Sequence, residues 1–313
     1  MTNRREFLEA LSAVALATAL PARLLAKDGP SRIPIAFSTL GCPAWDWLKI
    51  LDFAHQHGFS AIELRGLSGN MDLPSNPIFA PDRIEQTKKE IRAANLKIAN
   101  LGSSATLYFE DPAKREKELA DARRFIDLAE KLEAPYVRVF GGKAESDEAP
   151  VPDEATKKRV AAGLRELGTY AKPHNVTVII ESHDHFTSSA ALKDVLQAAG
   201  SDYVALLWDA HHTFATSNEE PEFTVKQLGQ WIRHTHLKDS VGSGEDRKYV
   251  LTGRGTVPVA RQIKALQSIG YKGYYCFEWE KMWHPDLEDP EIAIADYARV
   301  VGQCLGDAHA CGL

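Results

Sequence analysis

The chain has 313 residues, of which 44% are hydrophobic and 26% are charged, and its formal net charge at pH 7 is −6. This composition is that of a globular protein and excludes the disordered and fibrous classes. The 37 basic residues do not outnumber the 43 acidic ones, so the sequence offers no positive excess for nucleic acid, and none is expected as a partner.

Residues 1–26 have the pattern of an export signal. Arg4 and Arg5 precede the apolar stretch at residues 11–20, and small residues follow where a signal peptidase could cut. The pattern resembles a twin-arginine signal and predicts an exported, periplasmic or extracytoplasmic protein, with a cytoplasmic N-terminal helix as the alternative. No later apolar run reaches the roughly 20 residues that span a bilayer. We therefore expect no stable membrane insertion once the signal is removed.

From Ile33 onward, eight β-branched runs alternate with eight amphipathic segments, and no proline- or serine-rich linker divides them. We predict strands at residues 35–40, 61–65, 97–101, 136–140, 177–181, 204–209, 232–237 and 274–278. We predict helices near residues 46–57, 82–95, 113–133, 154–173, 189–199, 222–230, 257–269 and 291–305.

This alternation implies parallel strands with right-handed crossovers. Eight such units predict that residues 27–313 form one domain, an α/β protein with the (β/α)8 TIM barrel fold, which typically takes about 250 residues. An open doubly wound sheet is the alternative. However, the first unit has no GxGxxG after its strand, so a dinucleotide-binding sheet loses its main support.

The four cysteines, Cys42, Cys276, Cys304 and Cys311, include no CxxC pair. The sequence therefore does not indicate a zinc site made of thiolates. A Cys304–Cys311 disulfide would suit an oxidising compartment, and buried free thiols are equally compatible with the sequence.

Four side chains that can bind a metal stand at the ends of four consecutive predicted strands, where TIM barrels carry their active sites. Glu181, Asp209 and Glu278 end the fifth, sixth and eighth strands, and His236 lies near the end of the seventh. A buried carboxylate is costly unless it is paired or bound to a cation. We therefore expect one divalent ion bound by these four residues, with Mn²⁺ first and Mg²⁺, Co²⁺ or Zn²⁺ as alternatives.

Several motifs carry a family resemblance, namely FSTLGCPAWDWLKI, GFSAIELRG, VRVFGG, IIESH, WDAHH, HTHLKD and FEWE. Together they resemble the sugar phosphate isomerase/epimerase family of xylose-isomerase-like TIM barrels over about residues 33–305. The resemblance implies that Glu181, Asp209, His236 and Glu278 bind one divalent cation. It also implies that Glu181 and Glu278 are the catalytic acid and base, and that His212 lines the substrate pocket.

The resemblance implies an enzyme, a metal-dependent isomerase or epimerase acting on a sugar or keto-sugar through proton abstraction and an enediolate. A carbon–oxygen lyase or hydratase that acts on 3-keto-glycosides or keto-inositols by β-elimination from the same enolate is the main alternative. An apurinic endonuclease and a non-catalytic sugar-binding protein are further alternatives. Ketose epimerases carry a glutamate and an arginine where this chain has Thr187 and Gly242, which argues against free ketoses as substrates. The expected partner is a small carbohydrate, and a homo-oligomer is compatible with the resemblance.

Other polar residues near the strand ends carry weaker predictions. His183 is expected to line the pocket or to be solvated. Lys238 and Arg254 are expected to bind substrate oxygens or a phosphate, with a surface salt bridge as the alternative. His234 shares a face with His236 one layer deeper in the barrel, and it is expected to form hydrogen bonds there rather than to bind the metal. Glu63 and Arg65 are expected to form an ion pair in the barrel mouth, and Trp45, Trp279 and Trp283 would either face the sugar or pack in the core.

Overall fold

The computed structural model of the protein describes residues 32–142 and 151–306. The predicted export signal at residues 1–26 and the half-cystine candidate Cys311 lie outside the described residues. Export and the Cys304–Cys311 disulfide therefore remain predictions from the sequence.

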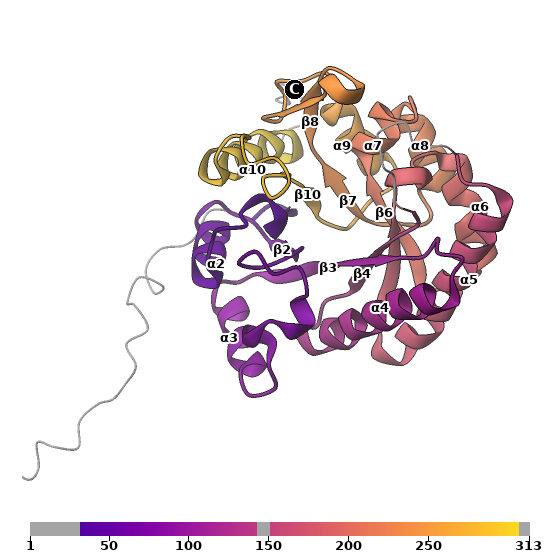
Figure 1. Ribbon diagram of the computed structural model, residues 1–313. Coiled ribbons are helices and arrows are strands. Elements are labelled where there is room, and N and C mark those ends of the chain that lie inside the picture. Colours follow the sequence, from indigo (N-terminus) through magenta and orange to yellow (C-terminus); the bar gives the residue numbers. More distant parts are fainter. Residues whose placement is uncertain (1–31, 143–150, 307–313) are drawn as a thin grey trace, which may run out of the picture.

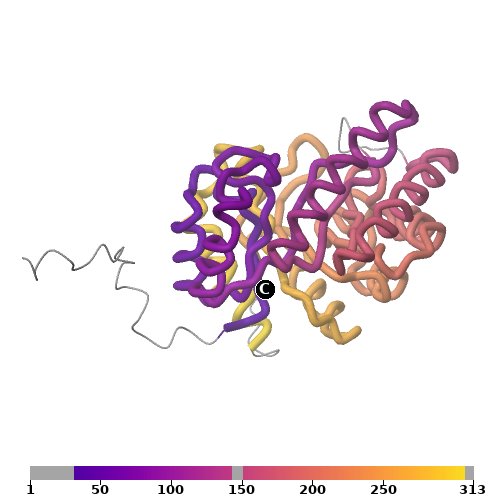
Figure 2. Tube along the Cα trace, turned by 90° about the horizontal axis from the view of Figure 1, so that it is seen from below, coloured from indigo at the N-terminus to yellow at the C-terminus, as the bar shows by residue number. Residues whose placement is uncertain are grey.

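Eight parallel strands form a closed barrel, which confirms the predicted TIM barrel fold (Figure 1). Around the barrel the strands follow the order β1-β10-β7-β6-β5-β4-β3-β2. The pairing of β1 with β10 closes it, and Figure 2 shows the indigo start of the described chain beside the yellow last helix. The strands are β1 (Ile35–Ser38), β2 (Ala61–Leu64), β3 (Lys97–Thr106), β4 (Tyr136–Phe140), β5 (Thr177–Glu181), β6 (Val204–Asp209), β7 (Ile232–Leu237) and β10 (Tyr275–Phe277).

The helices lie on the outside of the barrel (Figure 1). Asp46, Asp111 and Asp153 each cap a helix by accepting a hydrogen bond from a backbone N–H of its first turn. Among the described residues, no helix is both long enough and apolar enough to span a membrane. The principal helices are α2 (Trp47–Gln56), α3 (Ile84–Ala93), α4 (Pro112–Leu132), α5 (Glu154–Ala171), α6 (Ser189–Ala199), α8 (Pro221–Leu228), α9 (Val259–Ser268) and α10 (Pro290–Gly306).

Two features near the carboxyl ends of the strands were not predicted. A short helix, α7 (Ala210–Ala215), begins directly after β6. A two-stranded antiparallel hairpin, β8 (Asp239–Val241) and β9 (Lys248–Val250), follows β7. One buried carboxylate, Asp239, holds the loop after this hairpin by accepting hydrogen bonds from several backbone N–H groups. These additions lie on the face where the predicted site residues end their strands.

Part of the barrel interior is lined by small side chains, which leave space for polar side chains beside them. Ala36, Ala61, Ala99 and Cys276, from β1, β2, β3 and β10, form a separate small cluster inside the barrel. Because side chains alternate between the two faces of a strand, the residue two positions beyond Ala61, Glu63, also points inward. It is fully buried. The larger apolar core packs between the barrel and the helices.

Candidate metal centre

The four predicted ligands come together at the carboxyl end of the barrel. Glu181 and Asp209 are the last residues of β5 and β6, His236 lies in β7, and Glu278 follows β10 directly. The strand register places Asp209 opposite His236. One ligand atom from each of the four residues lies within 4.8 Å of the others, and all four residues are buried. Their convergence follows from parallel strands that end at one edge of the barrel.

The three carboxylates surround one nitrogen of the imidazole. His236 Nδ1 lies 3.1 Å from Glu181 Oε1, 3.2 Å from Glu278 Oε1 and 3.8 Å from Asp209 Oδ2. Burial raises the pKa of Asp209 to about 6, although the charge of Lys238 acts in the opposite direction. Three buried carboxylates and one imidazole are a donor set that fits Mn²⁺, Mg²⁺, Co²⁺ or Zn²⁺.

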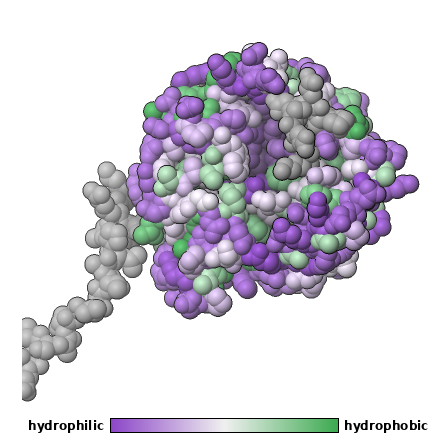
Figure 3. All heavy atoms as spheres, in the orientation of Figure 1, coloured by the Kyte–Doolittle hydropathy of each residue, from purple (hydrophilic) through white to green (hydrophobic). Residues whose placement is uncertain are grey.

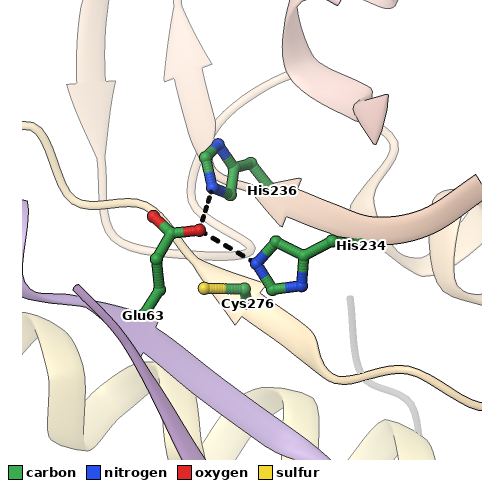
Figure 4. A group of neighbouring side chains, drawn as sticks. All are labelled: Glu63, His234, His236 and Cys276. Atoms are coloured by element: carbon green, nitrogen blue, oxygen red, sulfur yellow. Dashed lines mark hydrogen bonds and ion pairs between the residues drawn. The ribbon is translucent and has the colours of Figure 1, made fainter. Parts of the chain in front are cut away.

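The other nitrogen of His236 is held from below by Glu63 (Figure 4). His236 Nε2 and His234 Nε2 each lie 2.9 Å from Glu63 Oε2, and Asn100 Nδ2 donates to the same oxygen at 3.0 Å. Burial opposes ionisation of Glu63, but His236 and His234 hold its pKa well below the usual value. Burial would lower the pKa of His236, but Glu278, Glu63 and Glu181 raise it well above its usual value. In the neutral tautomer that carries its proton on Nε2 and donates it to Glu63, the lone pair of Nδ1 faces the three carboxylates and can bind a cation.

This arrangement corrects one prediction and agrees with another. Glu63 and Arg65 do not form the expected ion pair, because the carboxylate of Glu63 accepts from the two histidines instead. Arg65 Nη1 donates to Ser104 Oγ at 3.1 Å. His234 takes the supporting hydrogen-bonding position expected of it. The sequence signal for Glu63 was the single acidic residue on the inward face of β2.

Two cations lie against the carboxylates of the cluster. Arg138 Nε lies 3.0 Å from Glu181 Oε2, and Lys238 Nζ lies 2.9 Å from Asp209 Oδ2 and 2.7 Å from Glu280 Oε1. Lys238 also donates to Glu278. Lys238 is buried, so its alternative interpretation as a surface salt bridge is wrong. Arg138 and Glu280 were not predicted as site residues; the signal for Arg138 was a charged residue at an inward position of a buried strand.

A cavity of about 740 Å³ opens above the cluster, and Figure 3 shows a hydrophilic hollow in this face of the molecule. His212 lines it, as the resemblance implies, and so does His183, for which a pocket position was one of two alternatives; their rings meet edge to face at 4.5 Å. Burial would lower the pKa of His183, but Asp184 and Glu181 raise it to about 9. Burial and the charge of Lys238 lower the pKa of His212 well below its usual value. The two shifts have opposite directions, so protonation is favoured at His183 and disfavoured at His212.

The remaining predicted residues lie farther from the cluster. Arg254 does not line this cavity but a second one beside it; its side chain is 60% exposed and lies 3.7 Å from Asp296. Trp45 and Trp279 are buried in the core, whereas Trp283 is 50% exposed and lines the cavity. Tyr249, on the unpredicted strand β9, lines it as well. No local pattern in the sequence marks Tyr249 as a site residue.

Comparison with known proteins relates this chain to a family of TIM barrels and to a dehydratase. Residues 51–300 match the family model of the xylose isomerase-like TIM barrel. An inosose dehydratase of Bacillus cereus (strain AH820) is 23% identical over 226 residues, which cover 65% of this chain and 75% of that protein.

Three solved structures share the fold with this chain. The probable 3-DHS dehydratase AsbF from Bacillus anthracis has a TM-score of 0.70 at 17% identity and covers 86% of this chain and 99% of its own. D-psicose 3-epimerase from Clostridium cellulolyticum H10, solved with D-tagatose, has a TM-score of 0.70 at 17% identity and coverages of 87% and 99%. A xylose isomerase-like TIM barrel protein from Mycobacterium smegmatis in complex with magnesium has a TM-score of 0.67 at 20% identity and coverages of 89% and 98%.

Proposed function

This chain belongs to the xylose isomerase-like TIM barrel family, and from that premise we propose that it is a divalent-metal-dependent enzyme acting on a sugar or keto-sugar. The observation that carries the proposal is the convergence of Glu181, Asp209, His236 and Glu278 within 4.8 Å, with Glu181 and Glu278 lining a cavity. The complex of one structural relative with magnesium supports a divalent ion. When bound by these residues, the ion would act as a Lewis acid on a substrate carbonyl.

The residues around that position are suited to moving a proton on a carbon next to the carbonyl. Glu181 and Glu278 come from strands three places apart in the barrel and both line the cavity. Burial raises the pKa of Glu181, but Arg138 and His236 lower it below its usual value overall. Glu181 is thereby kept as a carboxylate, the form that accepts a proton. We propose that one glutamate removes the proton and the other returns one, which is isomerase or epimerase chemistry.

A dehydratase or other carbon–oxygen lyase is the second candidate. It uses the same proton removal, after which a C–O bond one carbon farther breaks, the electron pair leaves with the oxygen, and that oxygen takes up a proton. The inosose dehydratase similarity supports it. So does Thr187, which stands where the resemblance to ketose epimerases calls for a glutamate and which bonds to Ser217.

Mass spectrometry in D₂O tests the proposal. Metal-loaded protein would be incubated with ketoses, keto-inositols and 3-keto-glycosides. Deuterium gained with a changed stereocentre or carbonyl position identifies an isomerase or epimerase, whereas loss of water or release of an aglycone identifies the lyase. Glu278→Gln should abolish the reaction, and Glu85→Gln, which removes an exposed carboxylate on α3, should not. Metal bound by the wild type without any exchange would contradict the proposal.

The export signal adds a proposal about location. We infer from Arg4, Arg5 and the apolar stretch after them that the protein works outside the cytoplasm. Cell fractionation of the full chain, compared with a variant in which both arginines are lysine, tests this. Wild-type protein found only in the cytoplasm at its full mass would contradict it.

A further inference from the structure

A second cavity adjoins the one above the candidate metal centre. It has a volume of about 690 Å³, and Tyr249, Trp283 and His284 line both cavities. Each cavity alone lies in the range of roughly 300–1,000 Å³ that proteins use for a small molecule. The two together therefore have room for a ligand with two parts, joined across the three shared side chains.

The side chains that line both cavities are connected to the candidate metal centre through Glu280. Tyr249 donates a hydrogen bond to Glu280, and Glu280 also pairs with Lys238 at 2.7 Å. His284 Nε2 lies 3.8 Å from the same carboxylate, and its ring centre lies 5.5 Å from that of Tyr249. Because Lys238 also contacts Asp209, Tyr249 and His284 are connected through Glu280 and Lys238 to one of the predicted metal ligands.

Trp283 offers an aromatic surface at the junction. It lies in the segment after β10 and is 50% exposed, and its backbone N–H donates to Glu280 O at 3.0 Å. Beyond it the second cavity is lined partly by apolar side chains, including Val250, Leu251 and Leu287. An exposed aromatic face suits the C–H face of a sugar or another aromatic ring.

We propose that the second cavity is a subsite for the ring substituent of a glycoside, with Trp283 as its stacking surface. The inference rests on the proposed function, because a keto-sugar ring bound above the predicted metal-binding residues would direct its substituent toward the second cavity. The substituent is then either an aromatic aglycone or a second sugar ring, which share a flat or C–H-rich face. The substrate class becomes a keto-sugar carrying such a substituent, rather than a free monosaccharide.

Binding of unreactive glycosides tests the subsite. Titration calorimetry and saturation-transfer NMR would compare phenyl β-D-glucopyranoside, cellobiose and methyl β-D-glucopyranoside on the metal-loaded full chain. We expect the phenyl glycoside, cellobiose or both to bind about five- to tenfold more tightly than the methyl glycoside. Trp283→Ala should remove that preference and Trp283→Phe should keep most of it. Phe223→Ala, which removes a 50% exposed ring outside both cavities, should change nothing.

The outcomes separate the subsite from the proposed reaction. Equal affinities for all three glycosides in the wild type, or a preference that survives Trp283→Ala, would overturn the subsite. A preference for the phenyl glycoside alone assigns an aromatic aglycone, and one for cellobiose alone assigns a sugar. These probes have no carbonyl, so Glu278→Gln should keep the preference while losing deuterium exchange on keto-sugars. The subsite therefore stands or fails independently of exchange in the wild type.

Discussion

Replacing Glu63 by glutamine tests how the barrel interior controls the candidate metal centre. Three N–H groups, from His234, His236 and Asn100, converge on Glu63 Oε2 at 2.9–3.0 Å. Glutamine keeps an acceptor but removes the negative charge, so His236 Nδ1 becomes a weaker donor to a cation. Changing the outer partner of a metal-binding histidine typically costs 10- to 100-fold in affinity. That loss corresponds to about 1.4–2.7 kcal/mol.

The assay is a titration of metal-free protein with Mn²⁺ and Zn²⁺ in competition with a chelator of known affinity. Glu90→Gln is the matched control, because Glu90 is a partly buried carboxylate paired with Arg83 on α3, outside the cluster. Urea unfolding of each metal-free variant shows whether the fold is intact at the assay temperature. A folded Glu63→Gln protein whose affinity lies within twofold of the wild type would refute the role assigned to Glu63.

Three further outcomes are expected. Lys238→Met should destabilise the metal-free protein by about 3–5 kcal/mol, since it leaves buried carboxylates without their cation; thermal unfolding with and without Mn²⁺ should then show a larger metal-induced rise in Tm than in the wild type. Gly255→Ala should cost about 1–3 kcal/mol, because a Cβ would collide with Asp239; thermal unfolding measures this. Burial raises the pKa of Glu90, but Arg83 and its other hydrogen-bond donors lower it below its ordinary 4.5. Its stabilising contribution is therefore complete above about pH 4.5 and lost as the pH falls, so urea unfolding of wild type and Glu90→Gln should converge at low pH.

The barrel and the convergence of the four predicted ligands followed from simple periodicities. Strands and helices alternate eight times, and parallel strands end at one edge, so residues that end consecutive strands must meet. The position of Glu181 after Val178-Ile179-Ile180 already indicated a carboxylate at the end of a buried strand. These signals are local, and each can be read within a window of about 11–18 residues.

The support beneath His236 was not predictable in the same way. Alternation places Glu63 inside the barrel but does not say which side chain it meets there. β2 and β7 are not neighbours, since β1 and β10 lie between them, and only the closed barrel brings Glu63 to the histidines. The expected partner Arg65 is two residues along one strand, where successive same-face side chains lie about 6.6 Å apart. Glu63 therefore contacts the histidines across the barrel interior, and not Arg65 on its own side of the barrel.

The division between barrel and loops also bears on the reaction. In the proposed mechanism, proton removal depends on Glu181, Glu278 and a bound cation, which the strand ends would provide equally for an isomerase and a lyase. The two reactions differ in what happens to the neighbouring C–O bond, and therefore in what lies beside that bond. In this chain Tyr249 and Glu280, which line the cavity above the predicted metal ligands, come from the hairpin after β7 and the segment after β10, not from the barrel. Exchanging the hairpin and the part of the second segment that follows Glu278 for shorter loops should therefore change the fate of the enolate while leaving deuterium exchange intact.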